Sequence, residues 1–111
     1  MKMPLFRFRY AMTVVFFFVS ASVAPVASAS AALALEHGCF SCHGEPSRGG
    51  SPTMAQLSRH LVKYKGQMGE AARQGEKLRA GDEFKHITPH CMLSPEKATL
   101  LLQWLIDGAT P

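Results

Sequence analysis

Two cysteines and a histidine within five positions constrain this chain more than any other feature. The segment reads Cys39-Phe40-Ser41-Cys42-His43, which has the spacing C-x-x-C-H. This is the spacing by which haem is attached to a protein covalently, through two thioether bonds. Because Cys39 and Cys42 stand one helical turn apart, both sulfurs can reach the vinyl groups on one edge of the porphyrin. The motif therefore predicts one covalently bound haem c, with His43 as an axial ligand of its iron.

Residues 1–29 are predicted to be a cleavable secretory signal peptide. Three basic residues lie within the first nine positions, an apolar run follows at 11–19, and small residues supply a cleavage site after Ala29. The apolar run is shorter than the ~20 residues that a membrane-spanning helix needs. We therefore expect a periplasmic protein with no membrane span after signal cleavage.

Cleavage leaves residues 30–111 as one small domain, which buries only a modest core by itself. A bound haem would add apolar surface at its centre. The formal charge of +4 for the whole chain falls by three, to +1, because Lys2, Arg7 and Arg9 leave with the signal. Such a weak charge gives no case for nucleic-acid binding, which needs a clustered basic face.

The three cysteines of the chain allow other interpretations, and each fits less well than haem. A disulfide between Cys39 and Cys42 would be a strained crosslink and would leave Cys91 unpaired. A thioredoxin-like redox motif expects a βαβ pattern, and a structural zinc site expects four well-spaced ligands. The role of Cys91 stays open between a buried inert thiol, an intermolecular disulfide and a redox reporter beside the haem.

The chain after the signal reads as helices joined by loops rich in glycine and proline. Ser30 is a candidate N-cap for a first helix over 31–37, and Thr53 is a candidate N-cap for a second helix that ends by Gly66. A third helix is expected over 70–80. Periodic apolar residues, rather than alternating ones, predict an all-α fold.

The last helix has the clearest signals. Ser94 is its predicted N-cap, Pro95 takes the first helical position, and Gly108 closes it. Its apolar face includes Trp104, which we interpret as an ordinary core residue. Leu33, Leu35 and the haem edge are the expected partners of this face.

The order of signal, short helix, C-x-x-C-H motif, loop, middle helices and terminal Leu/Trp-rich helix resembles the small single-haem class I cytochromes c of bacteria. The resemblance covers residues 31–109. It implies the class I cytochrome c fold, in which short helices wrap around one haem and the N- and C-terminal helices pack together. It also implies an electron carrier that meets redox partner proteins transiently. Pro52 stands nine positions after His43, where the family uses a proline carbonyl to orient the imidazole.

The chain departs from this family at the sixth iron ligand. The family often carries Met-x-Pro-His-x-x-Leu-Ser before the last helix, and this chain places Ile87, which cannot bind iron, at the methionine position. His86 is our first candidate for the sixth ligand, because it lies one position away. Met92 is the second candidate, followed by an iron without a sixth protein ligand and by His90, which we expect to face outward.

The choice of ligand separates the expected functions. The leading hypothesis is a periplasmic electron carrier that is not an enzyme, since the sequence shows no nucleophile–base pair and no paired carboxylates. The alternative is a haem-based sensor or small-ligand-binding cytochrome with an open or weakly bound sixth position. A peroxidase-like enzyme is third, because it needs an open iron and a distal acid or base such as His86 or His90.

Overall fold

Every regular element in the described part of the chain is a helix. The computed structural model describes residues 26–82 and 86–111. Its elements are α1 (Val26–Glu36), α2 (Phe40–His43), α3 (Met54–Leu61), the 3-10 turn η1 (Val62–Tyr64), α4 (Glu70–Ala80), α5 (Thr88–Cys91) and α6 (Pro95–Ile106). The expectation of an all-α protein is therefore confirmed within these ranges.

Side-chain caps fix the starts of α3 and α6 as the sequence predicts. The Thr53 hydroxyl accepts a hydrogen bond from the Gln56 backbone, and the Gln56 side chain accepts one from the Thr53 backbone, which is a complete capping box. The Ser94 hydroxyl accepts from the backbone N–H of Lys97. The predicted cap at Ser30 is wrong, because α1 already begins at Val26. Ala27 and Ala29 have high helix propensity and favour this earlier start.

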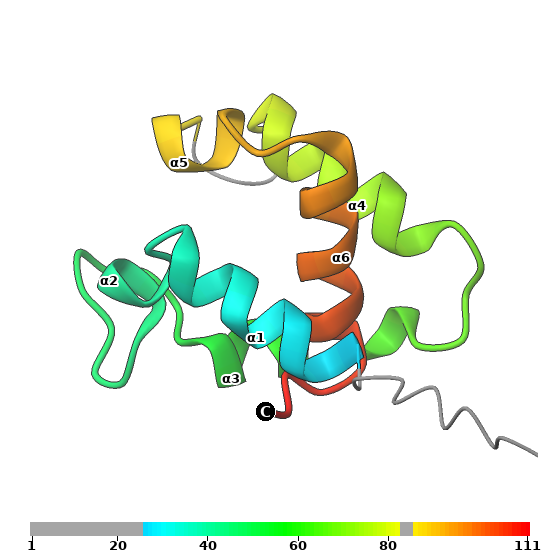
Figure 1. Cartoon of the computed structure of the whole chain (residues 1–111), viewed down its shortest axis with the longest axis horizontal. Helices are drawn as coiled ribbons and strands as arrows, with labels where there is room; N and C mark the ends of the chain where they lie inside the picture. The colour runs from blue at the N-terminus through cyan, green and yellow to red at the C-terminus, as the bar shows by residue number, and fades with distance from the viewer. Residues whose placement is uncertain (1–25, 83–85) are drawn as a thin grey trace, which may run out of the picture.

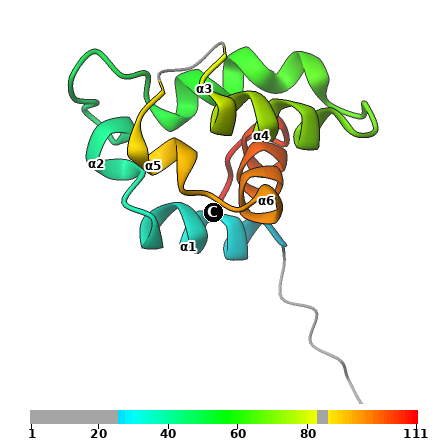
Figure 2. The ribbon, with the colours of Figure 1, turned by 90° about the horizontal axis from the view of Figure 1, so that it is seen from above.

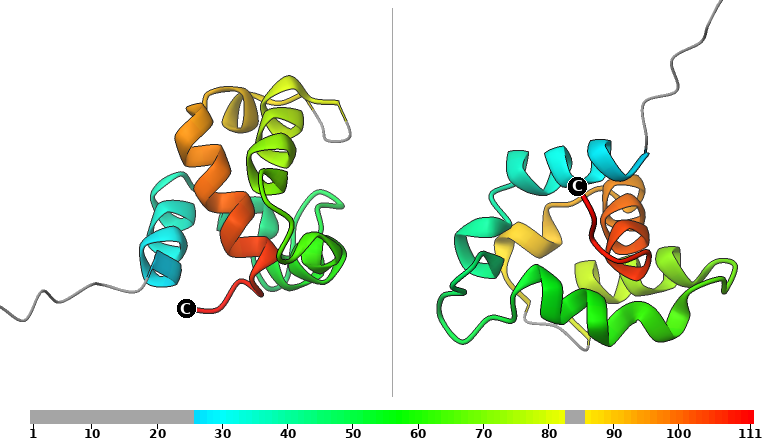
Figure 3. Two further views of the ribbon diagram at one scale, coloured as in Figure 1. Left: turned by 90° about the vertical axis from the view of Figure 1, so that its right-hand side faces the viewer. Right: turned by 90° about the horizontal axis from the view of Figure 1, so that it is seen from below.

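Helix α6 is the centre of the fold. Its buried face consists of Ala98, Leu101, Leu102, Trp104, Leu105 and Ile106. Helices α1, α3 and α4 all pack against it, and Figure 3 (left) shows α1 and α4 on opposite sides of α6. The expected pairing of the first and last helices is thus present. Leu33 packs on this core, whereas Leu35 is 70% exposed, so its predicted contact with the last helix is wrong.

Close approach between helices depends on small residues and one buried hydroxyl. A Cβ atom at Gly75 of α4 would lie only 3.1 Å from the Ala98 carbonyl carbon of α6, so the two backbones nearly touch there. The Ser58 hydroxyl donates to the Leu105 carbonyl at 2.7 Å and ties α3 to α6. These contacts hold α3 and α4 close against α6.

Helix α5 is a single turn in the connection between α4 and α6. Figure 1 shows α5 and α2 on the same side of α6, with α5 above α2 in this view, and Figure 2 shows the same region from above. The segment after α5 is fixed because Arg79 donates to the Leu93 carbonyl at 2.7 Å and Leu93 is buried. The segment that joins α5 to α6 is therefore held in place at Leu93.

The predicted signal peptide falls mostly outside the described residues. Residues 1–25, with the basic segment and the apolar run, are among those not described, and the predicted cleavage site after Ala29 lies within α1. Across 26–82 and 86–111, no helix has the length and apolar character needed to cross a membrane.

Candidate functional site

A cavity of about 520 Å³ opens between α2, α3, α5 and α6. This volume lies within the range of roughly 300–1,000 Å³ that is usual for small-molecule and cofactor sites. Its apolar wall consists of branched aliphatic side chains: Leu57, Leu61, Leu78, Ile87, Leu102 and Leu105. Three histidines and a cysteine also line it, namely His43, His60, His90 and Cys42. The cavity thus combines an apolar interior with a few groups that can bind a metal or form a covalent bond.

The C-x-x-C-H motif forms the turn of α2 at one wall of this cavity. The backbone N–H of His43 donates to the Cys39 carbonyl at 2.9 Å, so the two cysteines stand one helical turn apart as predicted. Cys42 is exposed and lines the cavity, whereas Cys39 is half-buried and packs on the core. Burial raises the pKa of the Cys39 thiol above its ordinary value of 9.0, and a backbone hydrogen bond partly opposes this. Cys39, Cys42 and Cys91 form no disulfide with one another.

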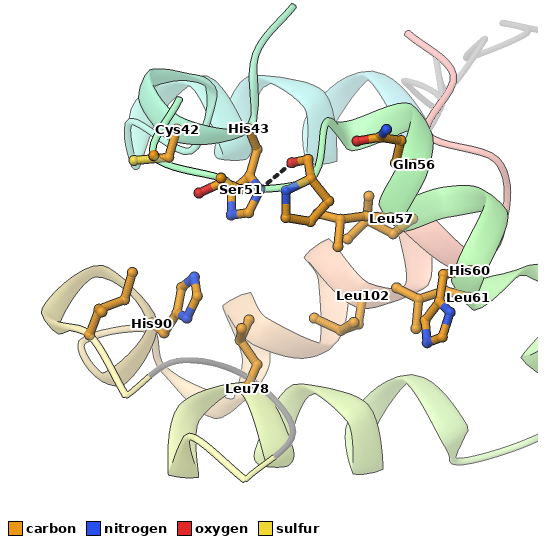
Figure 4. Close-up of a pocket in the computed structure, with 15 residues that line it drawn as sticks. Cys42, His43, Ser51, Gln56, Leu57, His60, Leu61, Leu78, His90 and Leu102 are labelled. Carbon is orange, nitrogen blue, oxygen red and sulfur yellow. Dashed lines mark hydrogen bonds between the residues drawn. The ribbon is translucent and has the colours of Figure 1, made fainter. Parts of the chain in front are cut away.

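His43 has a fixed tautomer and a fixed orientation. Its Nδ1 lies 2.6 Å from the backbone carbonyl oxygen of Pro52 (Figure 4). Because a carbonyl oxygen can only accept a hydrogen bond, Nδ1 carries the proton and Nε2 keeps its lone pair for another partner. The contact that the resemblance implies for Pro52 is therefore present, and its effect on an iron ligand remains a prediction.

The two residues ranked first and second for the sixth ligand lie away from this cavity. The described lining includes neither His86 nor Met92. The ring of His86 is held 3.2 Å from the Ala80 carbonyl oxygen and 3.5 Å from the Cys91 sulfur, and it packs directly over Gly81. Met92 is 77% exposed. Their assignment as iron ligands stays a prediction that this arrangement does not favour.

His90 lies on the cavity wall opposite His43. The centroids of the two imidazole rings are 6.2 Å apart and the ring planes differ by 17°. Figure 4 shows the two side chains projecting toward each other from α5 and α2, with His60 well apart from both. His90 is half-buried. The expectation that His90 faces outward is therefore wrong.

A local helical signal could have placed His90 correctly. Pro89 in the first turn is a common start of a helix, and residues three apart in a helix share one face. His90 lies within this turn and Ile87 is the extended residue just before it, and both line the cavity.

The residues around the cavity suit a covalently bound haem. Two thiols one turn apart can form thioethers, an oriented imidazole can bind iron, and aliphatic side chains can cover an apolar macrocycle. Within the residues that the structure describes, no three His, Cys, Asp or Glu side chains gather as a metal-binding cluster. A haem needs no such cluster, because the porphyrin itself supplies four of the iron's ligands.

Comparison of the chain with protein family models, with curated proteins and with solved structures found no match.

Proposed function

We propose that this protein is a single-haem c-type cytochrome that carries electrons between redox partner proteins in the periplasm. The observation that carries the proposal is the placement of the motif: Cys42 and His43 line an apolar cavity, and the Pro52 carbonyl holds the His43 ring. A C-x-x-C-H motif that occurred by chance would have no reason to sit beside such a cavity. When bound, haem c supplies an iron that alternates between Fe(II) and Fe(III).

The chain's own residues have three tasks in this proposal. The thiols of Cys39 and Cys42 would hold the haem through two thioether bonds. His43 binds iron through Nε2, because its Nδ1 donates to Pro52. The aliphatic wall excludes water from the ring, which lowers the local polarity and affects the reduction potential.

The class I cytochrome c fold is part of the same proposal. The described helices support it through the packing of α1 on α6 and through the position of α2 beside the cavity. The periplasmic location rests on the sequence of residues 1–29. Transient redox partners follow from the role of a carrier, which must release one partner before it meets the next.

The test is covalent haem attachment in cells that export the full chain and possess a cytochrome c maturation system. The wild type should give a haem-stained band that survives boiling in denaturant, and a pyridine haemochrome spectrum of the two-thioether type. The double variant Cys39→Ser/Cys42→Ser should lose the stained band, and the control Cys91→Ser should keep it. An exported wild-type protein without covalent haem would overturn the proposal.

A further inference from the structure

We propose that His90 is the second axial ligand of the haem iron, opposite His43. The inference rests on the proposed function, because it requires a haem in this cavity. It differs from the sequence expectation, in which His86 or Met92 takes this place. It is carried by the position of two imidazoles on opposite walls of one cavity.

The separation of the two rings suits a shared metal ion. Histidine nitrogens bind transition metals at about 2 Å, so two imidazoles on opposite sides of one ion have ring centroids about 6 Å apart. The centroids of His43 and His90 are 6.2 Å apart. The separation of the rings therefore matches that of two imidazoles on one iron, and the two nearly parallel rings, whose planes differ by 17°, would turn their Nε2 atoms toward it.

The local structure of α5 is what directs His90 inward. Ile87 has an extended backbone, and Pro89 lies in the first turn of the helix that follows. Both Ile87, just before this turn, and His90, within it, line the cavity. The chain is anchored just beyond α5, where Arg79 holds the Leu93 carbonyl. The short helix that carries His90 is therefore held in place by the hydrogen bond to Leu93 that follows it.

The competing candidates are held elsewhere. His86 packs over Gly81, where a Cβ atom would lie 2.7 Å from the His86 Cβ, so the two residues fit closely only because Gly81 has no side chain. Its ring nitrogens also contact the Ala80 carbonyl and the Cys91 sulfur. Met92 follows α5 with its side chain 77% exposed. Neither residue lines the cavity that His43 and His90 share.

Ligation by His43 and His90 has defined consequences. A methionine ligand raises the reduction potential of a haem relative to a second histidine, because the thioether favours the ferrous state. A haem held by two imidazoles would therefore have a lower potential than a methionine-ligated one. It would also be low-spin and closed to carbon monoxide, which fits a carrier better than a sensor or a peroxidase.

The experiment compares spectra of the purified holoprotein and three variants. The wild type should show a low-spin ferric spectrum without the near-infrared band of methionine-ligated haem c, and its ferrous form should not bind carbon monoxide. His90→Ala should become high-spin and bind carbon monoxide, and added imidazole should restore the low-spin spectrum. The matched controls His86→Ala and Met92→Leu should keep the wild-type spectrum.

Two further measurements keep the outcomes distinct. The pyridine haemochrome of each sample reports covalent haem whatever the axial ligand, so its absence in the wild type refutes the proposed function, and its presence leaves the ligand assignment to be decided by the spectra. His90→Met should restore a six-coordinate iron with a raised potential and the near-infrared methionine band, which guards against misfolding of the alanine variant. An unchanged spectrum in His90→Ala, or loss of the low-spin state in either control, would overturn the assignment.

Discussion

Replacing Leu102 by alanine tests whether the cavity wall is also the structural core. Leu102 lies on α6, is 2% exposed, and belongs both to the buried cluster and to the cavity lining. Removing a buried leucine side chain costs about 2–5 kcal/mol, through lost burial and the cavity that remains. For a domain of this size, about 3 kcal/mol corresponds to a fall in Tm of roughly 12–24 °C.

Leu100 provides the matched control on the same helix, because its side chain is 45% exposed. Leu100→Ala removes the same atoms from a half-exposed position, so it should cost about 1 kcal/mol or less. Urea denaturation of both holoproteins, followed by circular dichroism, gives the free energies of unfolding. Equal losses for the two variants would refute the view that α6 packs its Leu102 face into the core.

Three further predictions concern contacts that hold the helices. Hydrogen bonds from Arg73 and Gln74 hold the pKa of Glu70 below its ordinary value of 4.5. The stability that Glu70 contributes is therefore present above that pH and lost as the pH falls through the lowered value. Glu70→Gln should be less stable at neutral pH, and its free energy of unfolding in urea should depend less on pH in the acid range. Wild-type and variant curves of this free energy against pH that run parallel would contradict the role of these hydrogen bonds. Gly75→Val should lower stability by about 1–3 kcal/mol in a thermal melt, because its side chain would press on the backbone of α6; an unchanged Tm would disprove this close contact. Ser58→Ala should cost about 0.5–1.5 kcal/mol in urea denaturation through loss of its hydrogen bond to α6, and a gain in stability would count against that bond.

The sequence predicts helix positions well where side chains signal the helix ends. Thr53 and Ser94 cap their helices as expected, and the third predicted helix, 70–80, coincides with α4. These features depend on local hydrogen bonds and backbone preferences, which can be seen in a few neighbouring residues. Ser30 fits the same rule but lies inside α1, which already begins at Val26 with alanines at 27 and 29.

The site could be predicted only in part. The motif and the carbonyl of Pro52 are close in sequence to His43, so their spacing is informative. The opposite wall comes from α5, whose single turn is too short to give a periodic pattern. The inward direction of His90 depends on where that turn begins and on the anchored residue Leu93 beyond it. The start of this turn and the position of Leu93 both depend on packing against other helices, which the local sequence does not show.

The most direct test of the central claim is the mass of one tryptic peptide from the exported protein. If the signal is cleaved after Ala29, the first tryptic peptide of the mature chain is 30–48, which contains Cys39 and Cys42 and ends at Arg48. We predict that this peptide carries one haem linked to both cysteines, and that the peptide 86–97, with Cys91, carries none. A peptide 30–48 with free thiols or a disulfide would contradict the proposal that this protein is a c-type cytochrome.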